Sequence, residues 1–222
     1  MKLEESRNKH AGEEIFILGS GPSLDDFPDN FFDDKISIAV GDIHQVFPNC
    51  TYYFNIHRQE AAWILKNKPE TIHKLICGCP SSGRPDLNQM HEYGNKPMYV
   101  LWKVTNYNGF VKAVCSILRG EPCSLADIAT SVQPAIQVAA ILGAKKITLV
   151  GCEAQTTRDR FYVQKLTELH HMEKAVYSEA SQKGETDFFR RCKLGVKWLA
   201  DLFGPYGVEV ERFYYKTGYE EI

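Results

Sequence analysis

Short apolar runs recur along the chain, and each ends abruptly in glycine or polar residues. The run Ile15–Leu18 stops at Gly19, and the run Lys146–Val150 stops at Gly151. Their length and bulky side chains suit strands that are buried on both faces, as at the centre of a parallel sheet. Comparable runs predict further strands at residues 35–41, 51–56, 74–79, 98–104 and 208–214.

Apolar residues at helical spacing predict three helices between these strands. The helices begin, in order, near residue 61, after Thr130-Ser131, and after Thr186 or Asp187; they end near Pro69, at Gly143 and at Gly204-Pro205. We expect Thr130-Ser131 to cap the second helix and Thr186 or Asp187 to cap the third. Strands that alternate with helices predict an α/β fold, a three-layer, Rossmann-like arrangement with a mainly parallel sheet and helices on both faces.

The 222 residues are enough for one large core, and no linker divides them. We therefore expect a single Rossmann-like nucleotide-binding domain over residues 1–222. Glycine, asparagine and proline interrupt the periodic runs between about 81 and 128, which predicts a loop-rich excursion there. This excursion either overhangs a ligand pocket or is a plain surface loop, and the sequence leaves both readings open.

Composition narrows the class of partner. The formal net charge is −2, so no basic field favours nucleic acid as a partner. No apolar run is long enough to predict a membrane span, and residues 1–10 lack the apolar segment of a signal peptide. Seven cysteines, mostly inside apolar runs, are typical of reduced thiols, so we expect a cytoplasmic location. A homo-oligomer is an open alternative to a monomer.

The turn Gly19–Leu24, with the sequence Gly-Ser-Gly-Pro-Ser-Leu, is the main candidate for ligand binding. Glycines after a buried strand let another group approach the backbone closely, and free amides in such a turn suit phosphate. Ligands of open α/β sheets bind beyond the carboxyl ends of the strands, at the switch point. Other polar residues are predicted at the same edge: Asp42, Asn55, His57, Arg58, Thr130, Ser131 and Glu153. Asp42 also stands about where a dinucleotide site has its ribose-binding acid, although Leu24 replaces the third glycine of that motif.

Two blocks of sequence carry a resemblance to known families. The first is Ile17–Leu24; the second is Thr130-Ser131 followed by a helix and Ala140–Glu153, in which a Leu-Gly pair precedes a strand. Together they resemble the bacterial sialyltransferases that use a CMP-sugar, and the related hydroxymethylpterin diphosphokinase-like domain. The likeness covers about the first sixty residues and residues 126–155.

The resemblance implies roles for residues at matching positions. Gly19, Ser20, Gly21, Pro22 and Ser23 would contact the phosphate or ribose of a nucleotide. Asn55 matches an asparagine that binds the nucleotide, Thr130 and Ser131 match a donor-binding pair, and Tyr162 lies near a tyrosine that helps the phosphate leave. Ser20 and Asp42 depart from the pattern, since the sialyltransferases tend to have asparagine at both places. Asp42 then suits a ribose hydroxyl or Mg²⁺.

The sequence gives less support to catalytic residues than to binding residues. In the sialyltransferases that the chain resembles, the base is a histidine in the C-terminal part. No histidine of this chain keeps its spacing. His57 and Arg58 follow a predicted strand and face the crevice, so His57 is a candidate general base and Arg58 a candidate phosphate clamp. Both are equally well read as ordinary surface residues, and Tyr162 as a packing residue. Glu153 either binds a metal or an acceptor hydroxyl, or caps the turn that follows its strand.

These observations favour a nucleotide-dependent transferase, resembling sialyltransferase-type glycosyltransferases, with a nucleotide-sugar donor and a small-molecule or glycan acceptor. One alternative is a diphosphokinase that acts on a pterin-like alcohol. In that case Asp42 and Glu153 would hold Mg²⁺, which a triphosphate donor needs; otherwise no metal or cofactor is expected. The other alternative is a module that binds a nucleotide without catalysis.

Overall fold

The computed structural model describes residues 6–55, 67, 74–80, 99–103, 107–120, 125–127, 130–153 and 179–222. Within these residues the backbone forms one nine-stranded sheet in the order β6-β5-β4-β3-β2-β1-β7-β8-β9. All neighbours are parallel except β8 and β9. The strands are β1 (Glu14–Leu18), β2 (Ser37–Val40), β3 (Tyr52–Asn55), β4 (Leu75–Pro80), β5 (Tyr99–Lys103), β6 (Leu125–Asp127), β7 (Lys146–Val150), β8 (Glu209–Tyr214) and β9 (Gly218–Glu221).

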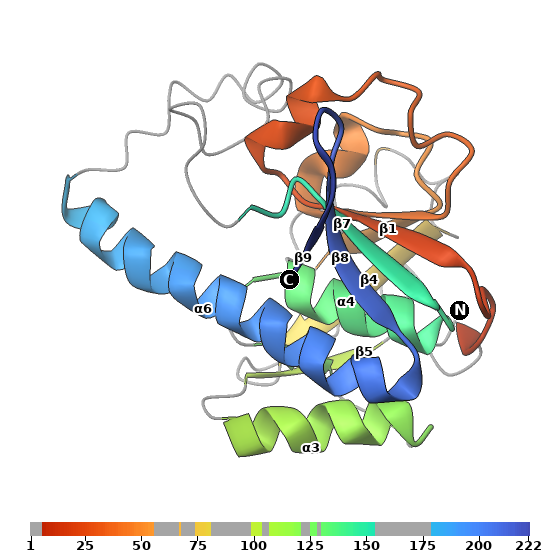
Figure 1. Cartoon of the computed structure of the whole chain (residues 1–222), viewed down its shortest axis with the longest axis vertical. Coiled ribbons are helices and arrows are strands. Elements are labelled where there is room, and N and C mark those ends of the chain that lie inside the picture. The colour runs from red at the N-terminus through yellow and green to blue at the C-terminus, as the bar shows by residue number, and fades with distance from the viewer. Residues whose placement is uncertain are drawn as a thin grey trace.

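The strand order places the switch point between β1 and β7. The chain adds β2 to β6 on one side of β1, then returns to add β7, β8 and β9 on the other side (Figure 1). β1 and β7 pair from Glu14 with Lys146 to Leu18 with Val150, so both strands end at the same level. Their side chains are buried on both faces apart from the first residue of each, as the apolar runs predict.

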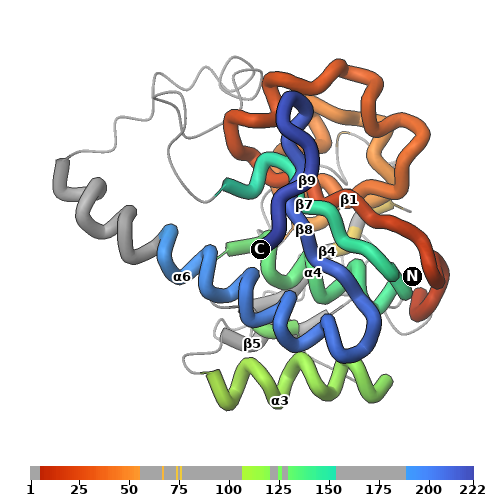
Figure 2. The backbone as a smooth tube through the Cα atoms, in the orientation of Figure 1, coloured from red at the N-terminus to blue at the C-terminus, as the bar shows by residue number. Residues whose placement is uncertain are grey.

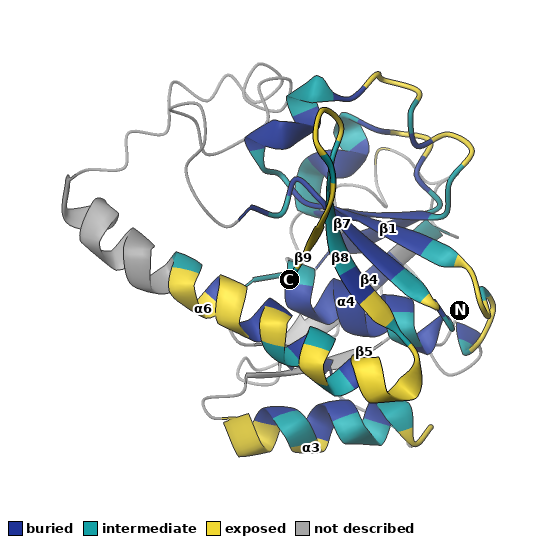
Figure 3. Cartoon of the chain, viewed as in Figure 1, coloured by how far each residue is buried: buried dark blue, intermediate teal, exposed yellow. Residues whose placement is uncertain are grey.

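In the described part of the chain, three α-helices cover one face of the sheet: α3 (Tyr107–Leu118), α4 (Val132–Ile141) and α6 (Glu179–Phe203). Their apolar side chains form one core cluster with alternate residues of the central strands, such as Ile15, Ile17 and Ile147. α6 keeps an exposed outer face along much of its described length (Figure 3). A short 3₁₀ turn, η5 (Gly204–Tyr206), joins α6 to the segment before β8.

The other face is covered by 3₁₀ turns and aromatic side chains. The turns are η2 (Pro22–Asp26) and η3 (Gly41–Gln45). Phe16 and Leu18 of β1 point to this side and join a second cluster that includes Leu24, Phe27, Phe32, Ile43 and Phe47. The expected three-layer, mainly parallel, Rossmann-like α/β fold is thus confirmed, with 3₁₀ turns forming the second outer layer in the described part of the chain.

Several local predictions were wrong. Within 81–128, where a loop-rich excursion was expected, the described parts include the twelve-residue helix α3 and β6 besides the predicted strand β5. The apolar spacing of Phe110, Ala113, Val114 and Ile117 gives α3 a buried face in spite of Gly109. α6 runs from Glu179, so Thr186 and Asp187 lie inside it rather than capping it. The helix predicted at 61–69 lies outside the described residues except for Asn67.

Residues 6–12 lie against the C-terminal end of α4 (Figure 2), and the guanidinium of Arg7 donates to the carbonyl of Ile117 in α3 at 3.1 Å. Backbone amides of Asn8, His10 and Gly12 donate to the carbonyls of Ile141, Leu142 and Gly143 at 3.0, 2.7 and 2.9 Å. Gly143 ends α4 as predicted, with φ of +94°, and the segment packs so closely that a Cβ there would lie 2.9 Å from the Cα of Asn8. In the described residues, no helix is long and apolar enough to cross a membrane.

Candidate functional site

The segments that follow β1 and β7 are bonded to each other beyond the ends of the strands. The amide of Gly19 donates to the carbonyl of Val150 at 2.8 Å, and the amide of Gly21 donates to the carbonyl of Gly151 at 2.7 Å. The turn Gly19–Leu24 and the segment Gly151–Glu153 therefore form one unit at the switch point. This is the place where open α/β sheets bind their ligands.

The side chain of Glu153 completes this unit. Its Oε1 accepts the backbone N–H of Ser23 at 3.0 Å, across 130 residues of sequence. Glu153 is 5% exposed and Ser23 is 8% exposed. Among the described residues, neither Oε2 of Glu153 nor Oγ of Ser23 has a hydrogen-bond partner. A buried polar atom without a partner is costly, so these two atoms mark a place where a ligand can supply the missing bonds.

The glycines of the turn make room for this contact. A Cβ on Gly21 would overlap Oε2 of Glu153 and lie 2.7 Å from the carbonyl oxygen of Gly151. Gly151 itself has φ of +64°, and a Cβ there would lie 2.8 Å from the Cγ of Leu24. The Gly-x-Gly pattern is thus explained by the close approach of the β7 segment.

The expectation that the turn offers free amides to phosphate was wrong for most of its residues. The amides of Gly19, Gly21 and Ser23 are engaged as described, and that of Leu24 donates to the carbonyl of Gly21 at 3.2 Å. Pro22 has no N–H to offer. The physical reason is that the chain supplies its own acceptors from the segment after β7. Contact of Gly19, Ser20, Gly21, Pro22 and Ser23 with a nucleotide stays a prediction.

Asp42 and Asn55 lie at the carboxyl ends of neighbouring strands, as predicted. Asp42 is in η3, directly after β2, where its Oδ1 is 3.4 Å from Nε2 of Gln45. Asn55 is the last residue of β3 and is 1% exposed. β2 and β3 pair in parallel, with Val40 opposite Phe54, so both residues share the edge of the sheet at which the turn Gly19–Leu24 lies.

Thr130 and Ser131 precede α4, which runs back along the sheet to β7. The start of α4 therefore lies toward the carboxyl edge of the strands. Ser131 occupies the N-cap position, but its side chain makes no capping hydrogen bond, contrary to expectation. Its backbone is helical, with φ of −63° and ψ of −18°, whereas a capping side chain requires a more extended residue. The hydroxyl of Ser131, which is partly exposed, is thus not used to cap the helix.

The three residues proposed for catalysis, His57, Arg58 and Tyr162, lie outside the described residues. The described residues contain no group of three or more His, Cys, Asp or Glu side chains that could hold a metal ion. Within the described residues, the Mg²⁺-binding alternative rests on Asp42 and Glu153.

Arg212 and Tyr214, at the end of β8, were not among the residues predicted for the site. Arg212 is opposite Leu149 of β7, and Tyr214 follows two residues later on the same face. Burial is the main reason that the pKa of Tyr214 rises to about 12, and Arg212 and Glu153 act on it with opposite signs. Burial, followed by the charge of Glu153, also raises the pKa of Cys152 to about 12. Arg212 and Tyr214 could not be predicted, because the alternating pattern of a strand does not tell which of its polar residues approaches a distant turn.

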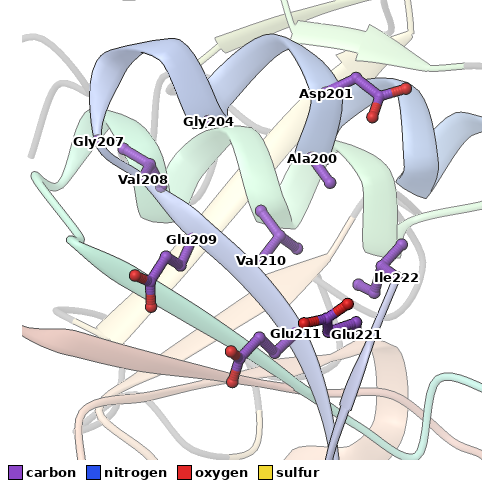
Figure 4. Close-up of a pocket in the computed structure, with 10 residues that line it drawn as sticks. All are labelled: Ala200, Asp201, Gly204, Gly207, Val208, Glu209, Val210, Glu211, Glu221 and Ile222. Carbon is purple, nitrogen blue, oxygen red and sulfur yellow. The ribbon is translucent and has the colours of Figure 1, made fainter.

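A hollow lies away from the switch point. It has a volume of about 370 Å³ and lies between the end of α6, β8 and β9 (Figure 4). Ala200, Val210 and Ile222 point into it, and four carboxylates surround them: Asp201, Glu209, Glu211 and Glu221. Its residues include the start of β8, at the amino edge of the parallel strands, opposite the edge where ligands of such sheets bind.

No protein-family model matches the chain, and no curated protein matches it. Among solved structures, the sialyltransferase CST-II in complex with a trisaccharide acceptor and CMP is 16% identical, over 91% of this chain and 81% of that chain, with a TM-score of 0.48. The CstII sialyltransferase from Campylobacter jejuni with cytidine-5′-monophosphate is 13% identical, over 91% and 80%, with a TM-score of 0.39. The monofunctional α-2,3-sialyltransferase Cst-I from the same organism is 11% identical, over 90% and 75%, with a TM-score of 0.39. These likenesses are distant.

Proposed function

We propose that the chain is a nucleotide-dependent glycosyltransferase, which transfers a sugar from a nucleotide-sugar donor to a hydroxyl of a small molecule or glycan. One observation carries this proposal. The two sequence blocks that resemble the sialyltransferase group lie far apart in the chain, and the bond from the amide of Ser23 to Glu153 joins them at the switch point. A donor nucleotide held there contacts both blocks.

The residues around the switch point supply the binding chemistry. Asp42 and Asn55 offer oxygen and amide groups that suit the hydroxyls of a ribose and the edge of a base. Thr130 and Ser131 offer hydroxyls beside the first turn of α4, where the positive end of the helix dipole favours a phosphate. Because most amides of the Gly19–Leu24 turn are engaged, we assign the donor phosphate to the start of α4.

Transfer requires a base for the acceptor hydroxyl and a group that stabilises the departing phosphate. His57 is the proposed base, Tyr162 the proposed proton donor to the leaving phosphate, and Arg58 the proposed charge partner. If CMP binds, His57→Ala should leave the affinity for CMP unchanged and abolish sugar transfer. Unchanged turnover would remove His57 from this role.

The identity of the bound nucleotide is tested by measuring the thermal stability of the protein with CMP, CDP, UDP, GDP and ATP, each with and without Mg²⁺. CMP at a hundred times its dissociation constant should stabilise the protein by about 2.7 kcal/mol without metal. Stabilisation by ATP only in the presence of Mg²⁺ points instead to the diphosphokinase. If no nucleotide stabilises the protein, both functions are contradicted.

The place of the phosphate is tested with Ser131→Ala. Loss of one hydrogen bond to a charged group should weaken CMP binding about tenfold or more and leave cytidine binding unchanged. Ser116→Ala is the matched control, because the hydroxyl of Ser116 is on exposed α3 and donates to the carbonyl of Lys112 at 3.2 Å. Equal loss of affinity for cytidine and CMP in Ser131→Ala would argue against a phosphate contact.

A further inference from the structure

The turn Gly19–Leu24 is contacted by a carboxylate of the protein itself, that of Glu153. The carboxylate of Glu153 accepts the Ser23 amide, a donor that a bound phosphate would otherwise use. Its second oxygen lies against Gly21, on the side that the missing Cβ leaves open. A glycine turn suits phosphate because it has a free amide and an uncovered backbone. Here Glu153 uses both features.

We infer that Glu153 excludes phosphate from this turn, so that a bound nucleotide lies with a neutral, hydroxyl-bearing part against it. The first part of this inference concerns the turn alone. The second part, the orientation of the nucleotide, rests on the proposed function. Together they make Glu153 a specificity-determining residue that selects against dinucleotides and other ligands whose phosphates need the glycine turn.

Charge and burial support the exclusion. A phosphate that reached the Ser23 amide would come within a few ångströms of the carboxylate, and the two negative charges would repel each other in a site that is largely removed from water. Arg212 lies close enough to act on Tyr214 and Cys152, as Glu153 does, but acts with the opposite sign. The Ser23 amide itself remains occupied by the carboxylate whatever the surrounding charge.

The remaining hydrogen-bonding capacity suits hydroxyl groups. Oε2 of Glu153 accepts only, and Oγ of Ser23 both donates and accepts. Both side chains are more than nine-tenths buried, and within the described part of the chain both atoms lack a partner. A sugar hydroxyl donates to the carboxylate and accepts from the serine, whereas a fully ionised phosphate has no proton to donate.

The exclusion is tested by following the backbone amide resonances of Gly21 and Ser23 by NMR during titration with inorganic phosphate. The protein is compared with Glu153→Gln, which keeps the size of the side chain and removes its charge. Glu209→Gln is the matched control, since Glu209 is exposed and lies at the start of β8. Phosphate should leave both resonances unmoved in the unaltered protein and in the control. In Glu153→Gln it should shift them, with an affinity at least about tenfold higher.

Two results would overturn the exclusion. One is a shift of the Ser23 resonance by phosphate in the unaltered protein, which needs no variant to fold. The other is the absence of any gain in Glu153→Gln. The variant's own spectrum reports whether it is folded, and Glu153→Asp, which keeps the charge, should behave as the unaltered protein does.

The orientation is tested in the same spectra with cytidine and CMP. Equal shifts of the turn resonances by both ligands place the nucleoside part at the turn and support the inference. Shifts with CMP and none with cytidine would place the phosphate there and overturn it. If neither ligand shifts any resonance, a cytidine nucleotide at this turn is contradicted, together with the inferred orientation for it. The proposed function fails only if the other nucleotides also do not bind, and the phosphate titration still decides whether Glu153 excludes anions.

Discussion

Gly21 has no room for a side chain, because the carboxylate of Glu153 occupies the space beside its Cα. Its own backbone is ordinary, with φ of −71° and ψ of 156°, so another residue could adopt it without strain. The requirement for glycine is therefore steric and depends on a group that arrives from the far end of β7.

Gly21→Ala is expected to destabilise the protein by about 1–3 kcal/mol, since Glu153 is buried and has to move. Urea unfolding measures this change. Gly204→Ala is the control, because a Cβ at Gly204 meets nothing within 4 Å and should change stability by no more than about 0.5 kcal/mol. Equal effects of the two substitutions would contradict the steric explanation.

For single residues, the sequence predicted that the turn needs glycine but not which group lies beside Gly21. A Gly-x-Gly pattern after a buried strand indicates close approach of some group, and phosphate was the expected one. The actual neighbour, Glu153, lies 130 residues away in the sequence. Its position at the edge of the sheet followed from the strand before it. Its hydrogen bond to Ser23 depends on the register between β1 and β7, which a single sequence does not reveal.

Two buried glutamines of α4 join this helix to β6 and α6. Gln137 forms two hydrogen bonds with the backbone of Ala126 in β6, at 2.8 and 2.7 Å. Gln133 donates to the carbonyl of Cys192 in α6 at 3.2 Å, and Gly195 of α6 leaves the space that its amide needs. The position of α4 relative to β6 and α6 is therefore set partly by polar contacts within an apolar layer.

Gly195→Ala should destabilise the protein by about 1–3 kcal/mol, because its Cβ would overlap the amide of Gln133. Helix propensity alone predicts the opposite sign, a gain of about 1 kcal/mol. The cost should disappear when Gly195→Ala is made in a Gln133→Ala background. Urea unfolding of the two single variants and the double variant measures this coupling, and additive effects would contradict it.

The elements were predicted best where hydrophobic periodicity was uninterrupted. β1, β7 and α4 occur close to where the apolar runs indicated. α3 was missed because glycine and asparagine near its start resemble a loop, although the apolar residues after Gly109 have helical spacing. The very short β6 depends on its neighbours β5 and α4, and that tertiary context is not readable from three residues.

At the scale of the whole molecule, the described groups Cys50, Cys152 and Tyr214 affect stability at high pH. Burial raises the pKa of Cys50 to about 11 and the pKa values of Cys152 and Tyr214 to about 12, above the ordinary values of 9.0 for cysteine and 10.0 for tyrosine. The folded protein therefore keeps these protons at pH values where the unfolded chain has lost them. Their contribution to stability is complete below about pH 9 and is lost as the pH rises toward the folded-state values.

The free energy of unfolding should fall above about pH 9, by at most about 1.4 kcal/mol per pH unit for each group that titrates. Urea unfolding between pH 7.5 and 10.5 at constant ionic strength measures this slope. Cys152→Ala removes one of the groups, so its stability should fall less steeply over this range. The same slope in both proteins would mean that Cys152 keeps an ordinary pKa in the fold.

The central position of β7 has a consequence for biosynthesis. The ribosome makes β1 to β6 before β7, although β7 lies between β1 and β8 in the finished sheet. The nascent chain thus displays the whole open edge of β1, and no acceptor yet exists for the Ser23 amide. Exposed apolar edges invite pairing with other chains. Newly made molecules should therefore depend on chaperones until residue 153 leaves the exit tunnel, and premature termination before residue 146 should yield aggregates.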